Sequence, residues 1–272
     1  MCRLDRQSIV SLVGGMPVRA CEFMERLAEA TSGVAELGLM ARASGMGAVA
    51  HRLSQLSLLS QSELGTLQKL EKRKEYDADA LIAGDGLSTY TAPRFLLSGW
   101  ACRQRVMSDG RRQIFGFLIP GDVVGAPSGP SAFANVVALT PVVTADVPLS
   151  EDKHLSSASA SVYSKLIAAA EHETEKLLYD HIVRLGRMNG LERMAHLLLE
   201  LRRRLSRVGL VNGQSFPMPL RQESLGDALG MSTVHVNRTM QQLRFKKLIQ
   251  CSGREVTVLD PVRLSALADG DV

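Results

Sequence analysis

Apolar and polar residues follow three successive patterns along this chain. Residues 49–76 show helical spacing with a capping signal at Ser60-Gln61-Ser62-Glu63, and an amphipathic helix is also predicted at residues 17–30. That earlier helix lies within residues 1–47, an extension rich in Ala, Gly, Ser and Met to which the pattern assigns no role. The first part of the chain is therefore predicted to be helical.

Short apolar segments broken by Gly, Pro and Asp fill residues 78–147. Asp109-Gly110 separates two such segments, and this dipeptide tolerates the positive φ angles of a tight hairpin turn. Pro120-Gly121-Asp122 marks a further turn. Short strands at this spacing predict a small antiparallel barrel or sandwich rather than alternating strands and helices.

A long helix is predicted from about Ser157, because apolar residues recur there at alternating steps of three and four. Such a stripe either covers the strand domain of the same chain or packs against a second copy, and its length favours a coiled-coil dimer interface. The predicted seam consists of Tyr163, Ile167, Ala170, Thr174, Leu177, His181, Leu185 and Met188.

Residues 219–261 predict two short helices joined by a tight turn and followed by a β-hairpin, which is a winged helix-turn-helix. In the first helix, Gly226 has no side chain where a second helix must approach closely. Gly230 can adopt the left-handed conformation that ends a helix, and Ser232 is a good N-cap for the next one. Inward packing is expected from Leu225, Leu229, Val236, Met240 and Leu243.

The outward face of the second helix has the residue types that contact bases in the major groove of DNA. The predicted base contacts are Thr233, Val234, Asn237 and Arg238. The hairpin around Ser252-Gly253 is expected to form a wing, and phosphate contacts are predicted for Arg221, Gln222, Ser232, Gln241 and Arg254.

The charge distribution also favours a polyanionic partner at this end of the chain. The formal net charge is only +4, yet 13 Lys and Arg stand against 6 Asp and Glu between Arg184 and Asp260. The rest of the chain then carries about −3. A helical hairpin that serves only protein contacts leaves this basic excess unexplained.

From about Ala48 to Asp269 the sequence resembles the Crp/Fnr family of bacterial regulators, most specifically in LERMAHLLLEL, LGDALGMSTVHVNRTMQQL and GREVTVLD. The resemblance implies an α+β protein: a jelly-roll-like β-roll sensor domain at 48–155, a dimerisation helix at 156–188 and a winged helix-turn-helix at 189–272. It further implies a homodimer on a palindromic double-stranded DNA site, with RNA polymerase as an additional partner.

Three departures from the family pattern narrow the expected signal and target. Family members that bind cyclic AMP have Gly-Glu and an Arg-containing segment where this chain has Gly125-Ala126 and Phe133-Ala134-Asn135. Because a buried phosphate needs a cationic partner, cyclic AMP binding is not expected. The clustered N-terminal cysteines of the iron–sulfur members are also absent, since Cys2 and Cys21 are too few and too distant. Thr233-Val234 replace the family's Arg-Glu pair, so a different operator is expected.

Other function classes lack their signatures in this sequence. There is no GxSxG, phosphate loop or GxGxxG, and residues 78–147 contain no His, so we expect no enzyme, no cofactor and no metal site. Cys102 is interpreted as a buried apolar residue, with a redox-active thiol as the alternative. Apolar runs are too short for a membrane span or signal peptide, which predicts a cytoplasmic protein. The alternative function is a ligand- or redox-responsive sensor whose output is a protein partner.

Overall fold

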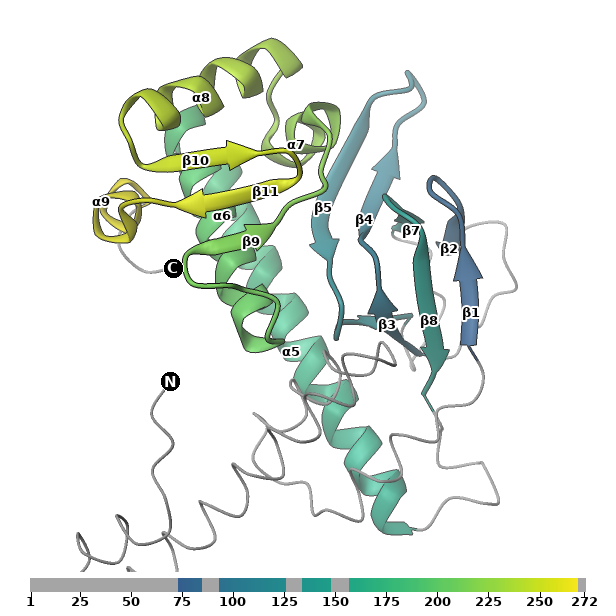
Figure 1. Ribbon diagram of the computed structural model, residues 1–272. Helices are drawn as coiled ribbons and strands as arrows, with labels where there is room; N and C mark the ends of the chain where they lie inside the picture. The colour runs from purple at the N-terminus through teal and green to yellow at the C-terminus, as the bar shows by residue number, and fades with distance from the viewer. Residues whose placement is uncertain (1–72, 85–92, 126–133, 148–156, 269–272) are drawn as a thin grey trace, which may run out of the picture.

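The computed structural model describes residues 73–84, 93–125, 134–147 and 157–268 and consists of a β-roll, a long helix and a C-terminal domain (Figure 1). The helices predicted at 17–30 and across 49–72 lie outside the described residues. The side chains of residues 157–163, 165 and 166 also lie outside them, and Tyr163 of the predicted seam is one of these.

The β-roll consists of two four-stranded antiparallel sheets with strand orders β1-β8-β3-β6 and β2-β7-β4-β5. This arrangement confirms the predicted antiparallel sandwich. Its apolar interior includes Ile82, Leu96, Leu118 and Val124, all of them buried. The strands are β1 (Arg73–Tyr76), β2 (Leu81–Ala83), β3 (Arg94–Ser98), β4 (Ala101–Val106), β5 (Arg112–Leu118), β6 (Val123–Val124), β7 (Asn135–Ala138) and β8 (Val142–Asp146).

The helical prediction for the end of residues 49–76 is wrong, because Arg73–Tyr76 form strand β1. This segment pairs antiparallel with β8, from Arg73 opposite Ala145 to Tyr76 opposite Val142. Its charged composition suits a helix, but the ladder to β8 and the burial of Tyr76 in the sandwich outweigh that local preference.

The two turns predicted in the strand region are confirmed. Between β4 and β5, Gly110 has a φ of 85°, and the amide of Met107 donates to the carbonyl of Arg111 at 2.8 Å. Gly121 has a φ of 94° in the turn that follows β5, where the amide of Asp122 donates to the carbonyl of Ile119. The second turn buries Asp122.

Two helices connect the β-roll to the C-terminal domain: α5 (Ser157–Arg187) and α6 (Gly190–Arg207). The helix break falls at Asn189, which forms a capping box with Glu192. Arg193 reinforces this junction by donating to the carbonyls of Leu185 and Met188 at the end of α5. It also donates to the carbonyl of Leu229 in the C-terminal domain, at 2.9 Å.

The C-terminal domain follows α6 with β9 (Ser215–Pro217), α7 (Gln222–Leu229), α8 (Thr233–Phe245), β10 (Ile249–Ser252), β11 (Glu255–Val258) and α9 (Pro261–Leu267). The predicted wing is the β10–β11 hairpin, and Gly253 in its turn has a φ of 57°. Strand β9 was not predicted, because its Pro217 argues against a strand interior; it pairs at the edge, next to β11.

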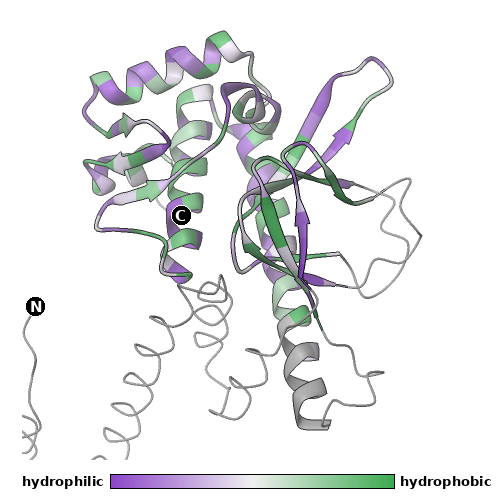
Figure 2. Cartoon of the chain, turned by 45° about the vertical axis from the view of Figure 1, so that its right-hand side comes forward, coloured by the Kyte–Doolittle hydropathy of each residue, from purple (hydrophilic) through white to green (hydrophobic). Residues whose placement is uncertain are grey.

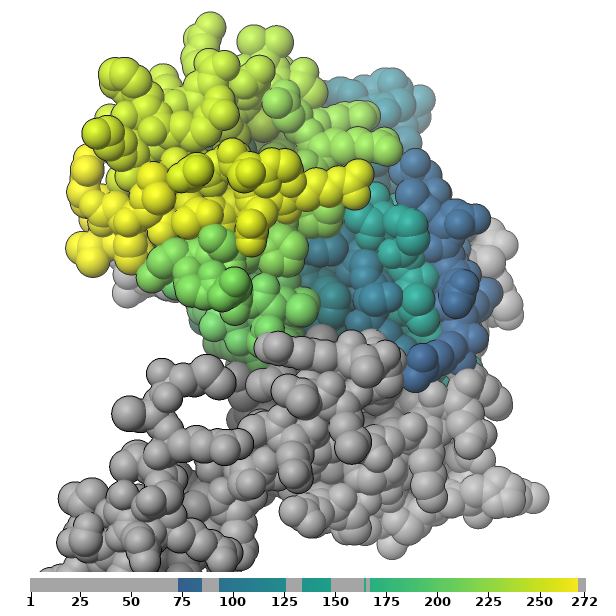
Figure 3. All heavy atoms as spheres, in the orientation of Figure 1, coloured from purple at the N-terminus to yellow at the C-terminus, as the bar shows by residue number. Residues whose placement is uncertain are grey.

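One hydrophobic cluster runs from the β-roll into the C-terminal domain. Trp100, Ile114 and Phe117 of the β-roll belong to it, as do Leu198 and Leu201 of α6. Along α6 and the strands, apolar residues alternate with polar ones (Figure 2), and the C-terminal domain and the β-roll form one continuous surface (Figure 3). The C-terminal domain is therefore held against the β-roll of its own chain. None of the helices in the described part of the chain is long and apolar enough to cross a membrane.

Candidate nucleic-acid interface

The turn between α7 and α8 has the predicted capping residues. Gly230 adopts the left-handed conformation with φ 62° and ψ 41°, and Ser232 is the N-cap of α8, where its Oγ accepts from the amide of His235 at 3.2 Å. Arg221 is the N-cap of α7 and makes no side-chain capping bond, as expected for a residue without a short oxygen-bearing side chain.

Gly226 lies where another part of the chain approaches closely, as predicted, but the nearest part is not the second helix. A Cβ at this position would lie 2.5 Å from the carbonyl oxygen of Met231 and 3.8 Å from Val236. The nearest neighbour is thus the turn backbone rather than the second helix, because the turn folds back over α7. The interior of this unit includes Leu225, Leu229, Val236 and Leu243 as predicted, together with Thr239, which was not.

The outer face of α8 is open to solvent. Thr233, Val234, Asn237, Arg238 and Gln241 are all exposed, and Val234 is 70% exposed. The side chains of Asn237 and Arg238 make no hydrogen bond or ion pair within the described residues. In Figure 1, α8 lies across the end of the molecule opposite the start of α5. The predicted base contacts therefore form one free surface.

The predicted phosphate contacts lie around this helix and on the wing. Ser232 accepts a bond through Oγ, which leaves its hydroxyl proton free to donate. Arg254 is exposed in the β10–β11 turn. Arg221 and Gln222 are exposed at the start of α7, where Arg221 borders a polar cleft shared with Arg112 of the β-roll.

Sequence reasoning missed a cluster at the end of α8. Arg244, Phe245, Lys246 and Lys247 are all exposed, and Phe245 is 90% exposed. Phe245 follows Val234 by eleven residues, about three helical turns, and so lies on the same side of α8. The run Arg-Phe-Lys-Lys was the available signal, and it extends the basic character of the surface along the helix.

Part of the stripe predicted as a dimer seam is buried within one chain. Ile167, His181 and Met188 are buried, and His181 lies 3.4 Å from the Nε2 atom of Gln113 on β5. Burial, and then the charge of Arg184, lower the pKa of His181 to about 4. The burial of these three residues within one chain, and the contact of His181 with β5, favour a different face of α5 for the proposed seam. The described side chains of Ala170, Thr174, Leu177 and Leu185 are half-buried beside them.

A neighbouring face of α5 is exposed and apolar instead. Ile182 is 65% and Tyr179 is 60% exposed, and Leu178 and Val183 are exposed beside them. Ile182 follows His181 directly, which rotates it by about 100° around the helix axis. The apolar stripe that faces solvent is therefore offset from the predicted one.

The chemistry of other candidate groups is limited. Burial raises the pKa of the Cys102 thiol to about 12, which leaves it protonated and favours its interpretation as a buried apolar residue. Among the residues that the structure describes, no three His, Cys, Asp or Glu gather as a metal site. The exposed face of α8, the second helix of the helix-turn-helix, has hydrogen-bonding groups that no described residue uses. Together with the wing and the β-roll, it defines a DNA-binding regulator of the winged-helix class.

Comparison with known proteins gives the family. A model of the Crp-like helix-turn-helix domain matches residues 192–267. The transcriptional activatory protein AadR of Rhodopseudomonas palustris is 30% identical over 173 residues, which cover 64% of this chain and 72% of that protein. The transcriptional activator protein FnrL of Cereibacter sphaeroides is 28% identical over 215 residues, with coverage of 77% and 85%.

A solved structure is also similar to this chain. FixK2 from Bradyrhizobium japonicum superposes with a TM-score of 0.63 and 29% identity, covering 72% of this chain and 96% of that one. The chain belongs to the Crp/Fnr family and is a DNA-binding transcription regulator.

Proposed function

We propose that the protein binds a specific, two-fold symmetric DNA sequence as a homodimer and regulates transcription from it. The observation that carries this proposal is the outer face of α8, where Arg238 and Asn237 are exposed and make no bond within the described residues. Polar groups held on a capped helix and aimed at solvent suit hydrogen bonding to base edges.

Each side chain of this surface has a distinct chemical role in the proposal. The planar guanidinium of Arg238 donates two hydrogen bonds to O6 and N7 of guanine, and the amide of Asn237 pairs with N6 and N7 of adenine. Val234 and the methyl group of Thr233 pack on thymine methyl groups. Ser232, Gln241, Gln222, Arg221 and Arg254 bind phosphates and fix the register without reading sequence.

The dimer is proposed to form through the exposed face of α5. Leu178, Tyr179, Ile182 and Val183 place four large apolar side chains in solvent at helical spacing. A contiguous apolar stripe of this kind is typical of a partner surface, and a parallel pair of long helices buries it symmetrically. Because α8 lies at the far end of the molecule from the start of α5, such a pairing presents two copies of α8 at the same end (Figure 1).

The proposal also assigns a role to each part of the chain. Residues 48–155 form the sensor domain, 156–188 the dimerisation helix and 189–272 the DNA-binding domain, while 1–47 are an extension of unassigned role. RNA polymerase is the proposed additional partner, and the cytoplasm the proposed location, since the target is the chromosome. We propose binding without a catalytic step.

The test is selection of bound fragments from a random pool of double-stranded DNA by the full-length protein. The expected result is a consensus with two inverted half-sites about one helical turn apart. Enrichment of a sequence without two-fold symmetry contradicts the homodimer. No enrichment at all contradicts sequence-specific binding and favours an output through a protein partner.

Cyclic AMP is expected neither to bind nor to change the affinity for DNA. In the two altered segments, Gly125 follows β6 and Asn135 begins β7, whereas Ala126 and Phe133 lie outside the described residues. Without the family's carboxylate and arginine, the ribose and the cyclic phosphate lose their charged partners. Isothermal titration calorimetry should detect no saturable heat, and a micromolar site would contradict this prediction.

A further inference from the structure

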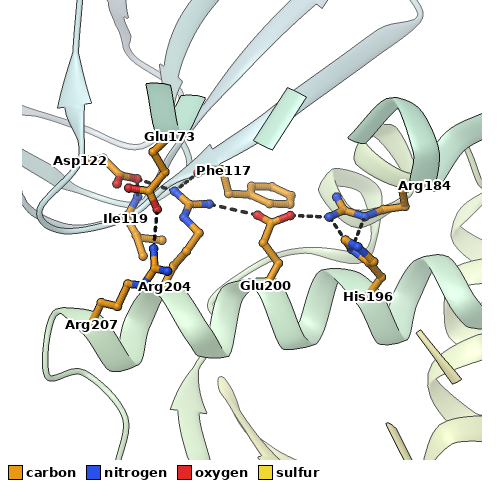
Figure 4. A network of polar contacts seen from close by, with 9 residues as sticks. All are labelled: Phe117, Ile119, Asp122, Glu173, Arg184, His196, Glu200, Arg204 and Arg207. Carbon is orange, nitrogen blue, oxygen red and sulfur yellow. Dashed lines mark hydrogen bonds and ion pairs between the residues drawn. The ribbon is translucent and has the colours of Figure 1, made fainter. Parts of the chain in front are cut away.

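Buried charged side chains link the β-roll to both helices of the junction (Figure 4). Asp122 of the β-roll pairs with Arg204 on α6, which pairs with Glu200 on the same helix. Glu200 pairs with Arg184 on α5, and Arg184 donates to His196 on α6. We call these five residues the buried relay. All of them are at least nine-tenths buried.

At the β-roll end, the relay binds the turn after β5 through several atoms. The Nη2 atom of Arg204 donates to the carboxylate of Asp122 at 2.6 Å and to the carbonyl of Phe117 at 2.9 Å. The same carboxylate oxygen accepts from the amide of Ile119 at 2.8 Å. The position of α6 is thereby tied to the backbone of β5 as well as to the side chain of Asp122 in the turn.

At the helix end, the relay ties α6 to α5. Burial alone would raise the pKa of Glu200, but Arg184 and Arg204 outweigh it and hold that pKa below its ordinary value. Burial and Arg184 lower the pKa of His196, so the ring is neutral near pH 7. Its Nδ1 then accepts from Arg184 Nε at 3.2 Å. Opposite charges alternate along the relay, and each has a partner.

Such a relay contributes geometry more than stability. Burying charges costs about as much as pairing them returns, so a buried ion pair often stabilises a fold no better than apolar residues of similar volume. Its hydrogen bonds nevertheless tolerate few arrangements, because a shifted guanidinium leaves a buried group without a partner. The Nε atom of Arg204 already has no partner within the described residues. The polar contacts of the Arg204 side chain are thus made by its two Nη groups.

The angle of α6 governs the position of α8, the proposed recognition helix. Arg193 of α6 donates to the end of α7, and a Cβ on Gly190 of α6 would lie 2.7 Å from the Nε2 atom of His235 on α8. These contacts leave little room for α8 to move independently of α6. A rotation of α6 against the β-roll and α5 is therefore transmitted to the DNA-binding surface.

We propose that the buried relay positions the recognition helix and so sets the half-site spacing that the dimer accepts, with Asp122 and Arg204 as its key positioning residues. This inference rests on the proposed binding of a symmetric DNA site. Its specific consequence is that weakening the relay reduces discrimination between spacings, a property that a purely structural ion pair would not alter.

The test compares the wild type with the double variant Asp122→Asn, Arg204→Met on the selected operator and on versions with one base pair added or removed between half-sites. One base pair rotates a half-site by about 35°. Wild type should bind the altered versions at least tenfold more weakly. The double variant should lose about tenfold on the selected spacing and discriminate between spacings by less than threefold. It removes both charges of the link and leaves Glu200 paired with Arg184.

Arg207→Ala is the matched control, because Arg207 on the same helix pairs with Glu173 on α5, not with the β-roll, and is half-exposed. It should retain the wild-type spacing ratios. A folded, dimeric double variant with wild-type ratios overturns the proposal, even if all its affinities fall together. If thermal denaturation shows that the double variant is unfolded, Asp122→Asn alone, which keeps an acceptor for Ile119, must show reduced discrimination. Failure of the wild type to select any DNA would instead overturn the proposed function.

Discussion

Replacing Ile182 with Lys is expected to convert the proposed dimer into monomers at micromolar concentration. Ile182 is 65% exposed in one chain, so the substitution leaves the fold of that chain intact. In the dimer each copy would lose the burial of an isoleucine, about 1.5 to 3 kcal/mol per chain, and would bury an ammonium group instead. The dissociation constant should rise at least about 100-fold. Sedimentation equilibrium measures this directly.

The control for this experiment is Val262→Lys on α9. Val262 is 77% exposed but lies on a different element, so the variant carries the same added charge without touching α5. It should remain dimeric. A dimeric Ile182→Lys variant would show that the pairing surface lies elsewhere, and Ile167→Lys is unsuitable because Ile167 is buried within its own chain.

Removing Arg238 should relax the preference for one base at one position of each half-site. Arg238→Ala would lose the proposed bidentate contact to guanine, and loss of such a contact typically costs about 1 to 3 kcal/mol per half-site. Arg238 is exposed and makes no hydrogen bond or ion pair within the described residues, so the stability of the variant protein should equal that of the wild type. The measurement is the affinity for the selected operator and for scrambled DNA at several salt concentrations.

Arg254→Ala is the comparison, because Arg254 is exposed at the wing turn and is proposed to contact a phosphate. This variant should bind all DNA more weakly and reduce the slope of log affinity against log salt by about one unit per contact. Arg238→Ala should weaken binding to the operator much more than to scrambled DNA. Equal weakening on both would show that Arg238 contacts the backbone.

Features that depend on short-range sequence were predictable. Gly230, Ser232 and the Asp109-Gly110 turn act through their own backbone conformations or through a bond to a residue three positions away. The outer face of α8 follows equally from helical periodicity, since its inward residues identify the opposite side. For this reason the wing and the proposed base contacts could be named from the sequence.

Features that depend on how distant elements pack against each other could not be predicted in the same way. Arg73–Tyr76 has a helical composition but becomes a strand because β8 offers it a partner. Periodicity located an apolar stripe on α5, yet it could not tell whether the β-roll or a second copy covers it. Only the packing of His181 and Met188 within the chain moved the proposed seam to Ile182 and its neighbours.

The buried relay shows most clearly which features could not be predicted from the sequence. Asp122 and Arg204 are 82 residues apart, and in the sequence each looks like an ordinary surface charge. Local chemistry was enough to specify the turns, the caps and the solvent-exposed side of α8, because those depend on neighbouring residues. Pairing between distant charges depends on how whole elements dock, and docking results from many weak contacts that no short stretch of sequence contains.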